Sequence, residues 1–188
     1  MEKKVYFDMT DIQTLYQNAI KFAAERHGSQ KVKGSKISYV VHLSNVAMEL
    51  FVAARNTPGF DLSLAIQAAL LHDTIEDTAT TRQEIEATFG QDVADAVWAL
   101  TKDKKLLEDY RLTDSLAKIR QCPKEVWAVK LADRITNLQK PPENWSKDHI
   151  TEFHYDSVQI LEALEGGNQY LEQRLKVKIN EYKEYLQD

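Results

Sequence analysis

Apolar residues recur every three or four positions along most of this chain, which is the spacing of one face of an α-helix. Turn-forming residues are few, six glycines and four prolines, and they fall between the periodic segments. No extensive segment alternates β-branched and polar residues as a strand would. We therefore expect an all-α protein, a bundle of about eight to ten helices. The predicted helices cover approximately residues 8–28, 39–54, 61–71, 81–89, 93–100, 116–119, 123–140, 150–164 and 168–186.

The predicted helix that ends near residue 71 is apolar almost all round, which indicates a central, buried position. It leads directly into the sequence HDTIEDT, with one imidazole and three carboxylates. If the helix continues, His72 and Glu76 share one face, and so do Asp73 and Asp77. Crowded carboxylates at the end of a buried helix are unfavourable unless a cation neutralises them or water reaches them freely. The stretch favours a metal site, and a solvated acidic helix end is the alternative.

Two further polar residues lie beside predicted apolar faces. His42 falls at the start of the helix predicted from residue 39, where a hydrogen-bonded core histidine is the commoner role. Asp133 borders the apolar face of a later helix and shares a face with Asn137, and a salt bridge to Lys130 or Arg134 would explain it alone.

Taken together, these residues form a larger candidate site. Two imidazoles and two carboxylates suit a divalent transition ion such as Mn²⁺, Fe²⁺ or Zn²⁺. The candidate ligands come from three predicted helices: His42, His72, Asp73 and Asp133.

Composition and charge narrow the class of protein. The chain has 188 residues, 43% hydrophobic and 28% charged, which fits a single globular domain over residues 1–188. The lone cysteine, Cys122, cannot form an internal disulfide, which favours a reducing compartment. We find no apolar segment typical of a signal peptide or a membrane span, so we expect a cytoplasmic protein without a membrane partner.

The formal net charge of −5 gives no reason to expect a nucleic-acid partner. An anionic ligand must therefore be met by local positive charge or by a metal. Residues 30–36 carry three lysines joined by Gly and Ser, which makes them a candidate mobile clamp for an anion. A solvated surface loop is the commoner fate of such a stretch.

The order His42, then His72-Asp73, then Asp133 resembles that of the HD-domain metal-dependent phosphohydrolases. The longer strings HDTIEDT at residues 72–78 and KLADRITNL at residues 130–138 resemble the alarmone hydrolase domain of the RelA/SpoT class, in particular its stand-alone small members. The similarity extends from about residue 11 to residue 164. It implies a hydrolase without a synthetase domain.

The resemblance assigns roles by position. It implies that His42, His72, Asp73 and Asp133 hold one metal, typically Mn²⁺. Glu76 and Asp77 match the family's catalytic acidic pair. The implied substrate-binding set comprises Asn137, which matches a nucleotide-contacting asparagine, together with Lys33, Lys36, Lys102 and Tyr155.

The implied reaction removes the 3′-pyrophosphate of guanosine tetra- or pentaphosphate and leaves GDP or GTP. The expected partner is thus a small purine nucleotide with 3′-phosphates, and homo-oligomer formation stays open. Val32 stands where the family has an arginine that helps hold the base, and Ser38 and Leu43 replace prolines around Tyr-x-x-His.

These departures leave other substrates open, namely an adenine alarmone, NADPH or a 5′-nucleotide. A non-catalytic nucleotide-binding module is an alternative of another class. The presence of every expected ligand and of both acids argues against that module.

Overall fold

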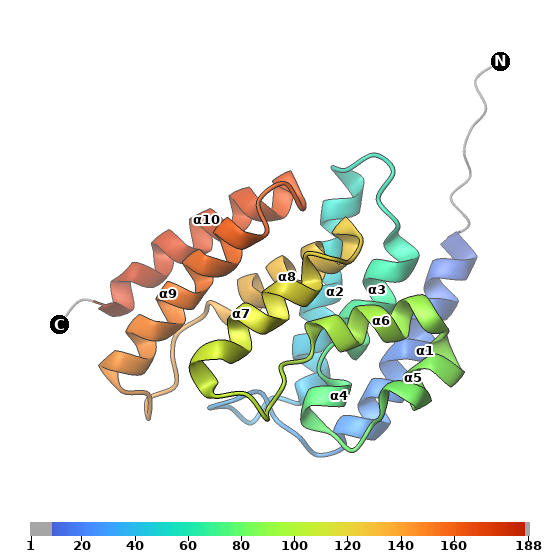
Figure 1. Cartoon of the computed structure of the whole chain (residues 1–188), viewed down its shortest axis with the longest axis horizontal. Helices are drawn as coiled ribbons and strands as arrows, with labels where there is room; N and C mark the ends of the chain where they lie inside the picture. The colour runs from blue at the N-terminus through green and yellow to red at the C-terminus, as the bar shows by residue number, and fades with distance from the viewer. Residues whose placement is uncertain (1–8, 187–188) are drawn as a thin grey trace.

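The computed structural model describes residues 9–186, and these confirm the all-α prediction (Figure 1). They form ten α-helices and one 3-10 helix, and their β-type pairing is limited to one isolated bridge between Lys31 and Ser38. The predicted helix start near residue 8 and the expected lack of a leader segment concern residues outside the described range. The helices are α1 (Met9–His27), α2 (Tyr39–Arg55), α3 (Leu62–Leu71), α4 (Thr74–Asp77), α5 (Arg82–Phe89), α6 (Gln91–Leu100), α7 (Glu108–Ile119), α8 (Lys124–Asn137), α9 (Lys147–Ala163), α10 (Gln169–Tyr182) and the 3-10 helix (Lys183–Leu186).

Helix α3 occupies the centre of the bundle, as its apolar sequence predicts. Seven of its ten residues are buried, and it packs against α1, α2, α6 and α8. Asp61 caps its start by accepting hydrogen bonds from the backbone N–H groups of Ser63 and Leu64, at 3.0 and 3.2 Å. None of the helices in the described residues is both long and apolar enough to cross a membrane.

Local sequence signals define several other helix ends. Thr81 and Glu84 form a capping box at the start of α5. Gly90 follows α5 with a φ of 88°, a conformation that favours glycine. Asn168 caps α10 by accepting from the backbone N–H of Leu171 at 3.1 Å.

The chain does not continue from α3 as a single helix through HDTIEDT. Helix α3 ends at Leu71, and His72 and Asp73 turn the chain before the short α4 begins. The Thr74 hydroxyl donates to the Leu71 carbonyl at 2.6 Å, and such side-chain bonds compete with the helical ladder. The four ionisable groups therefore do not lie along one helix face.

Helix α7 is longer than the short helix predicted around residues 116–119. It begins at Glu108. Acidic residues occupy its first turn, where their negative charge interacts favourably with the positive end of the helix dipole. Its buried side recurs at helical spacing, but one of the buried residues is polar, so the apolar pattern alone did not predict the first half of the helix. The buried residues are Leu112, Ser115, Leu116 and Ile119.

The core makes one prediction about helix α2, which carries His42. Leu50 on this helix is fully buried, so Leu50→Ala should lower the free energy of unfolding by about 2–5 kcal/mol through lost contacts and a residual cavity. Urea unfolding followed by circular dichroism measures this change. Met48, 61% exposed on the same helix, is the control, and Met48→Ala should change stability by no more than about 0.5 kcal/mol. Equal losses in the two variants would contradict the packing described here.

Candidate functional site

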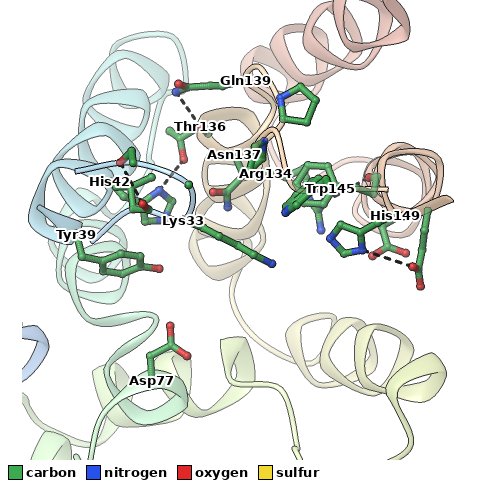
Figure 2. Close-up of a pocket in the computed structure, with 18 of the residues that line it drawn as sticks. Lys33, Tyr39, His42, Asp77, Arg134, Thr136, Asn137, Gln139, Trp145 and His149 are labelled. Atoms are coloured by element: carbon green, nitrogen blue, oxygen red, sulfur yellow. Dashed lines mark hydrogen bonds and ion pairs between the residues drawn. The ribbon is translucent and has the colours of Figure 1, made fainter. Parts of the chain in front are cut away.

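A pocket of about 1310 Å³ opens where the loops after α1, α6 and α8 meet (Figure 2). Four of the five predicted substrate-binding residues line it, and Lys36 lies in the first of these loops but is not among the lining residues. Of the predicted residues that line the pocket, one lies in the loop after α1, one in the loop after α6, one at the end of α8 and one on α9. They are Lys33, Lys102, Asn137 and Tyr155.

The lysine-rich loop forms one wall of this pocket. Lys33 extends towards Trp145, with its Nζ 5.0 Å from the centre of the indole ring. Gly34 has a φ of +75°, and a Cβ there would lie 2.7 Å from the Cβ of Pro142. Only glycine fits this approach, so the loop is held against the proline-containing segment that follows α8.

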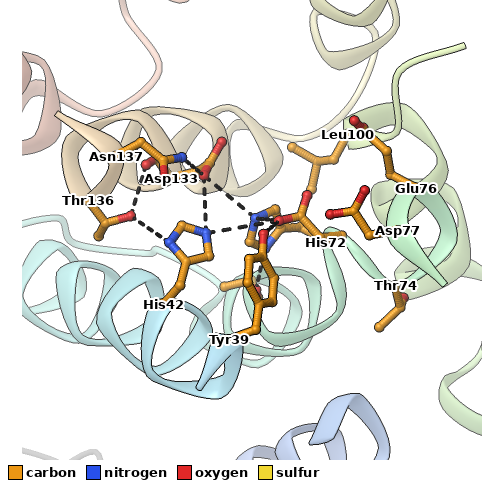
Figure 3. Close-up of polar contacts among 12 residues, drawn as sticks. Tyr39, His42, His72, Thr74, Glu76, Asp77, Leu100, Asp133, Thr136 and Asn137 are labelled. Atoms are coloured by element: carbon orange, nitrogen blue, oxygen red, sulfur yellow. Dashed lines mark hydrogen bonds and ion pairs between the residues drawn. The ribbon is translucent and has the colours of Figure 1, made fainter. Parts of the chain in front are cut away.

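Three of the predicted metal ligands meet next to the pocket, which His42 also lines (Figure 3). His42 comes from α2, His72 from the turn after α3, and Asp133 from α8, and each is buried. Their candidate ligand atoms all lie within 4.8 Å of one another. The Asp133 Oδ1 is 3.4 Å from the His42 Nε2 and 3.6 Å from the His72 Nε2.

Asp73 is the fourth residue of this cluster. Its Oδ2 lies 2.9 Å from the His72 Nε2 and 4.0 Å from the His42 Nε2. The Tyr39 hydroxyl donates a hydrogen bond to the same oxygen. The fold therefore brings together all four residues that the sequence nominates as ligands.

The protonation pattern of the two imidazoles fits a metal ion. The His72 Nδ1 lies 2.7 Å from the Ala69 carbonyl, which can only accept, so Nδ1 carries the hydrogen. The His42 Nδ1 lies 3.3 Å from the Thr136 hydroxyl, whose own hydrogen goes to the Asp133 carbonyl.

Both Nε2 atoms are buried without a hydrogen-bond partner and face the cluster. Imidazoles fixed through Nδ1 and aimed through Nε2 at carboxylates are typical of metal sites. The donor set thus suits a divalent cation.

Electrostatics lead to the same conclusion. Burial disfavours a charged His72, but the Asp73 and Asp133 carboxylates together outweigh it and raise the pKa of His72 well above its usual 6.5. Burial would raise the pKa of both carboxyl groups, yet the charge of His72 beside Asp73 and that of Lys130 beside Asp133 hold both values well below their usual range. The carboxylates of Asp73 and Asp133 lie close together and largely out of water, which is unfavourable unless positive charge neutralises them. A proton on His72 or a metal can supply that charge.

Asp133 also forms the salt bridge that the sequence offered as its alternative role. The Lys130 Nζ lies 3.0 Å from its Oδ2, while Asn137 donates to its Oδ1 at 2.6 Å. Arg134 instead packs its guanidinium over the Phe153 ring, 4.2 Å from the ring centre. One carboxylate therefore serves both the bridge and the cluster.

The two remaining acids of HDTIEDT are held by loops. Glu76 accepts a hydrogen bond from the backbone N–H of Lys102 at 2.9 Å. Lys104 contacts the Glu76 carbonyl and lies 3.6 Å from the Asp77 Oδ1. Gln30 donates to the other Asp77 oxygen at 3.4 Å. Both acids line the pocket and belong to none of the metal-ligand contacts above.

Two residues of this site, Tyr39 and Lys104, were not predicted from the sequence. Tyr39 precedes His42 by three positions, so it shares a helix face with that ligand. Lys104 had no such signal, because its contact with α4 depends on how the loop after α6 folds back.

Comparison with known proteins places the chain among HD-domain proteins. A family model described as "HD domain" matches residues 19–160. Guanosine-3′,5′-bis(diphosphate) 3′-pyrophosphohydrolase MESH1 of Xenopus tropicalis is 37% identical over 172 residues, covering 89% of this chain and 94% of that protein. The Homo sapiens protein of the same name is 38% identical over 168 residues, covering 84% and 89%.

Solved structures agree with these matches. A structure described as a metazoan ortholog of SpoT that hydrolyzes ppGpp superposes with a TM-score of 0.78 at 28% identity, covering 89% of this chain and 94% of that one. A protein from Listeria monocytogenes EGD-e gives a TM-score of 0.62 at 27% identity, covering 76% and 99%.

The pKa of His72 predicts how metal binding depends on pH. In the ion-free protein the raised pKa stabilises the fold below pH 6.5, and this contribution is lost as the pH rises through the folded value. The lowered pKa values of Asp73 and Asp133 contribute stability above pH 3.8, which is lost as the pH falls.

A metal bound through Nε2 must displace the His72 proton. The rise in Tm caused by manganese should therefore be small near pH 5.5 and larger near pH 8. These two values lie on either side of about 6.5, the usual pKa of histidine. Thermal unfolding with manganese and with chelator, at each pH, measures this difference. A Tm rise of the same size across the range would contradict the competition.

Proposed function

We propose a function on the premise that this chain belongs to the HD-domain family and, within it, to the guanosine-3′,5′-bis(diphosphate) 3′-pyrophosphohydrolases. The chain hydrolyses the 3′-pyrophosphate of guanosine tetra- or pentaphosphate and releases pyrophosphate with GDP or GTP. The observation that supports this most is that Glu76 and Asp77 line the same pocket as His42, which belongs to the four-residue ligand cluster. A set of metal ligands with two further acids nearby suits metal-assisted hydrolysis, because acids that do not bind the metal can orient water and transfer protons.

The metal in this proposal is one Mn²⁺ ion held by His42, His72, Asp73 and Asp133. When bound, it supplies Lewis acidity that polarises a phosphoryl oxygen and makes water a better nucleophile at neutral pH. Tyr39 and Lys130 hold the two carboxylates in place through the contacts described above. The single unpaired cysteine agrees with a cytoplasmic setting.

The acidic pair handles the water and its proton. Glu76 is fixed by the Lys102 N–H at one oxygen, so it can take a proton from the attacking water while keeping its position. Asp77 orients that water. The water oxygen forms a bond to the 3′-linked phosphorus, the bond from phosphorus to the 3′ oxygen breaks, and the 3′ oxygen gains a proton.

Local positive charge compensates the substrate phosphates, as the net negative chain requires. Lys33 and Lys102 line the pocket, and Lys104 adds a cation beside the acids. Asn137 donates its Nδ2 to Asp133, which leaves its Oδ1 as the atom to accept a hydrogen bond from the nucleotide. Tyr155, 60% exposed, offers its ring at the rim.

A second substrate, a 3′-pyrophosphorylated adenosine nucleotide, is supported by one specific observation. Val32 lines the pocket where the family has an arginine for the base. An apolar side chain cannot donate to the acceptor edge of guanine, so selection for guanine over adenine is weaker here.

The proposed reaction is tested with a panel of 3′-pyrophosphorylated guanosine and adenosine nucleotides, each assayed with manganese and with chelator. We expect manganese-dependent release of pyrophosphate, and phosphate assays with and without added pyrophosphatase distinguish it from orthophosphate. Release of orthophosphate alone would indicate another HD phosphohydrolase. Tight nucleotide binding without turnover would replace the enzyme with a binding module.

The role of Glu76 is tested by Glu76→Gln, which keeps the side-chain shape but removes the proton acceptor. Turnover should fall by about 10²–10⁴-fold while manganese still binds, because Glu76 belongs to none of the ligand contacts. Steady-state kinetics and metal titration measure the two effects. Glu86→Gln, an exposed charge change on α5, is the matched control and should keep its turnover. An unchanged rate in Glu76→Gln would assign proton transfer to another group.

A further inference from the structure

A buried histidine outside the ligand cluster is linked to one of the proposed catalytic acids, Asp77, through the side chain of a glutamine. His27 ends α1 and is 5% exposed. Its Nδ1 lies 2.8 Å from the Gln30 Oε1, which is a carbonyl oxygen and can only accept. The Nδ1 therefore carries the hydrogen, and the amide is turned so that its Nε2 donates to the Asp77 Oδ2 at 3.4 Å. The contacts run in one direction, from His27 through Gln30 to Asp77.

The same histidine also borders the metal-ligand side of the site. Its ring centre is 4.8 Å from that of Tyr39, which in turn is 5.2 Å from His42. The Gln30 backbone joins the two sides, because its N–H donates to the His27 carbonyl at 2.9 Å and its carbonyl accepts from the Tyr39 N–H at 3.1 Å. Tyr39 holds Asp73 through its hydroxyl. His27 and Gln30 thus support both Asp73 and Asp77.

A purely structural role explains this arrangement poorly. The His27 Nε2 is buried without a hydrogen-bond partner, which is unfavourable in a core position that an apolar side chain could fill. The gain that offsets this cost is the directed hydrogen bond from Nδ1.

We propose that His27 and Gln30 are positioning residues that orient Asp77 towards the attacking water. The inference rests on the proposed function, because the orientation matters only if Asp77 takes part in hydrolysis. Neither residue touches the substrate in this role. His27 acts through Gln30, and Gln30 acts through the carboxylate.

Two substitutions of His27 separate the hydrogen-bond donor from the ring. Asn has an Nδ2 the same number of bonds from Cα as the His Nδ1, so His27→Asn can restore the donor without the ring. His27→Phe keeps a ring of similar size and has no donor. We expect kcat to fall by about ten- to hundredfold in His27→Phe and to be largely retained in His27→Asn, with KM and the manganese midpoint unchanged in both. The opposite order of kcat values would overturn the proposal in favour of ring packing.

Gln30 is half-buried, and its variants avoid a large change in the core. Gln30→Met removes both hydrogen bonds, and Gln30→Glu keeps an acceptor for His27 but loses the donor to Asp77. Both should lower kcat, and Gln30→Met combined with His27→Phe should lower it no further than the worse single variant. Additive losses of kcat would show that the two substitutions act independently, which would contradict the proposed chain of contacts from His27 through Gln30 to Asp77. Ser29→Ala, an exposed change between the two residues, is the control.

A measurement without turnover separates this inference from the proposed function. ¹⁵N chemical shifts of the His27 ring in the ion-free protein should show a hydrogen on Nδ1, and Gln30→Met should shift that signal. A ring with its only hydrogen on Nε2 would overturn the relay whatever the activity. An inactive wild type that shows the expected Nδ1 hydrogen would instead count against the hydrolase and its catalytic Asp77.

Discussion

The structure depends on two carboxylates, the half-buried Asp73 and the buried Asp133, which face the same pair of imidazoles. Like charges removed from water repel each other strongly unless positive charge lies between them. Lys130 compensates one carboxylate, and the cluster still favours a proton on His72. This remaining demand for positive charge is what makes the centre of the bundle a cation site rather than an ordinary polar core.

The demand also explains the local fold. Helix α3 is buried on nearly every side, and it must end at Leu71 so that His72 and Asp73 can turn into the space between α2 and α8. Ligands from packed helices are held rigidly, whereas Glu76 and Asp77 receive their contacts from the loops after α6 and α1. A rigid ligand set beside loop-held acids leaves the pocket open to a large substrate without loosening the metal centre.

Much of this could be predicted from the sequence because it depends on local signals. Helical spacing predicted elements that the structure confirms, among them α3 and α5. The family prediction is confirmed as well, since its motif residues are short strings readable without a structure. The end of the buried helix at residue 71 agrees with its apolar pattern, but that pattern does not show the turn at residues 72–73, where the Thr74 hydroxyl donates to the Leu71 carbonyl.

Contacts between distant segments were beyond the sequence. His27, Gln30 and Asp77 meet only because α1 packs beside α4, and nothing in their spacing predicts that packing. The same holds for Lys104. The predicted roles of all the substrate-binding residues stay predictions. Lys36 lies outside the pocket lining, and Tyr155 lines the pocket but is largely exposed.

Anomalous diffraction at the manganese absorption edge, from a crystal grown with manganese, is the most direct measurement of the central claim. We predict one strong peak enclosed by the Nε2 atoms of His42 and His72 and by the carboxylates of Asp73 and Asp133. A map without a peak at that position, or with manganese bound only elsewhere on the chain, would contradict the account.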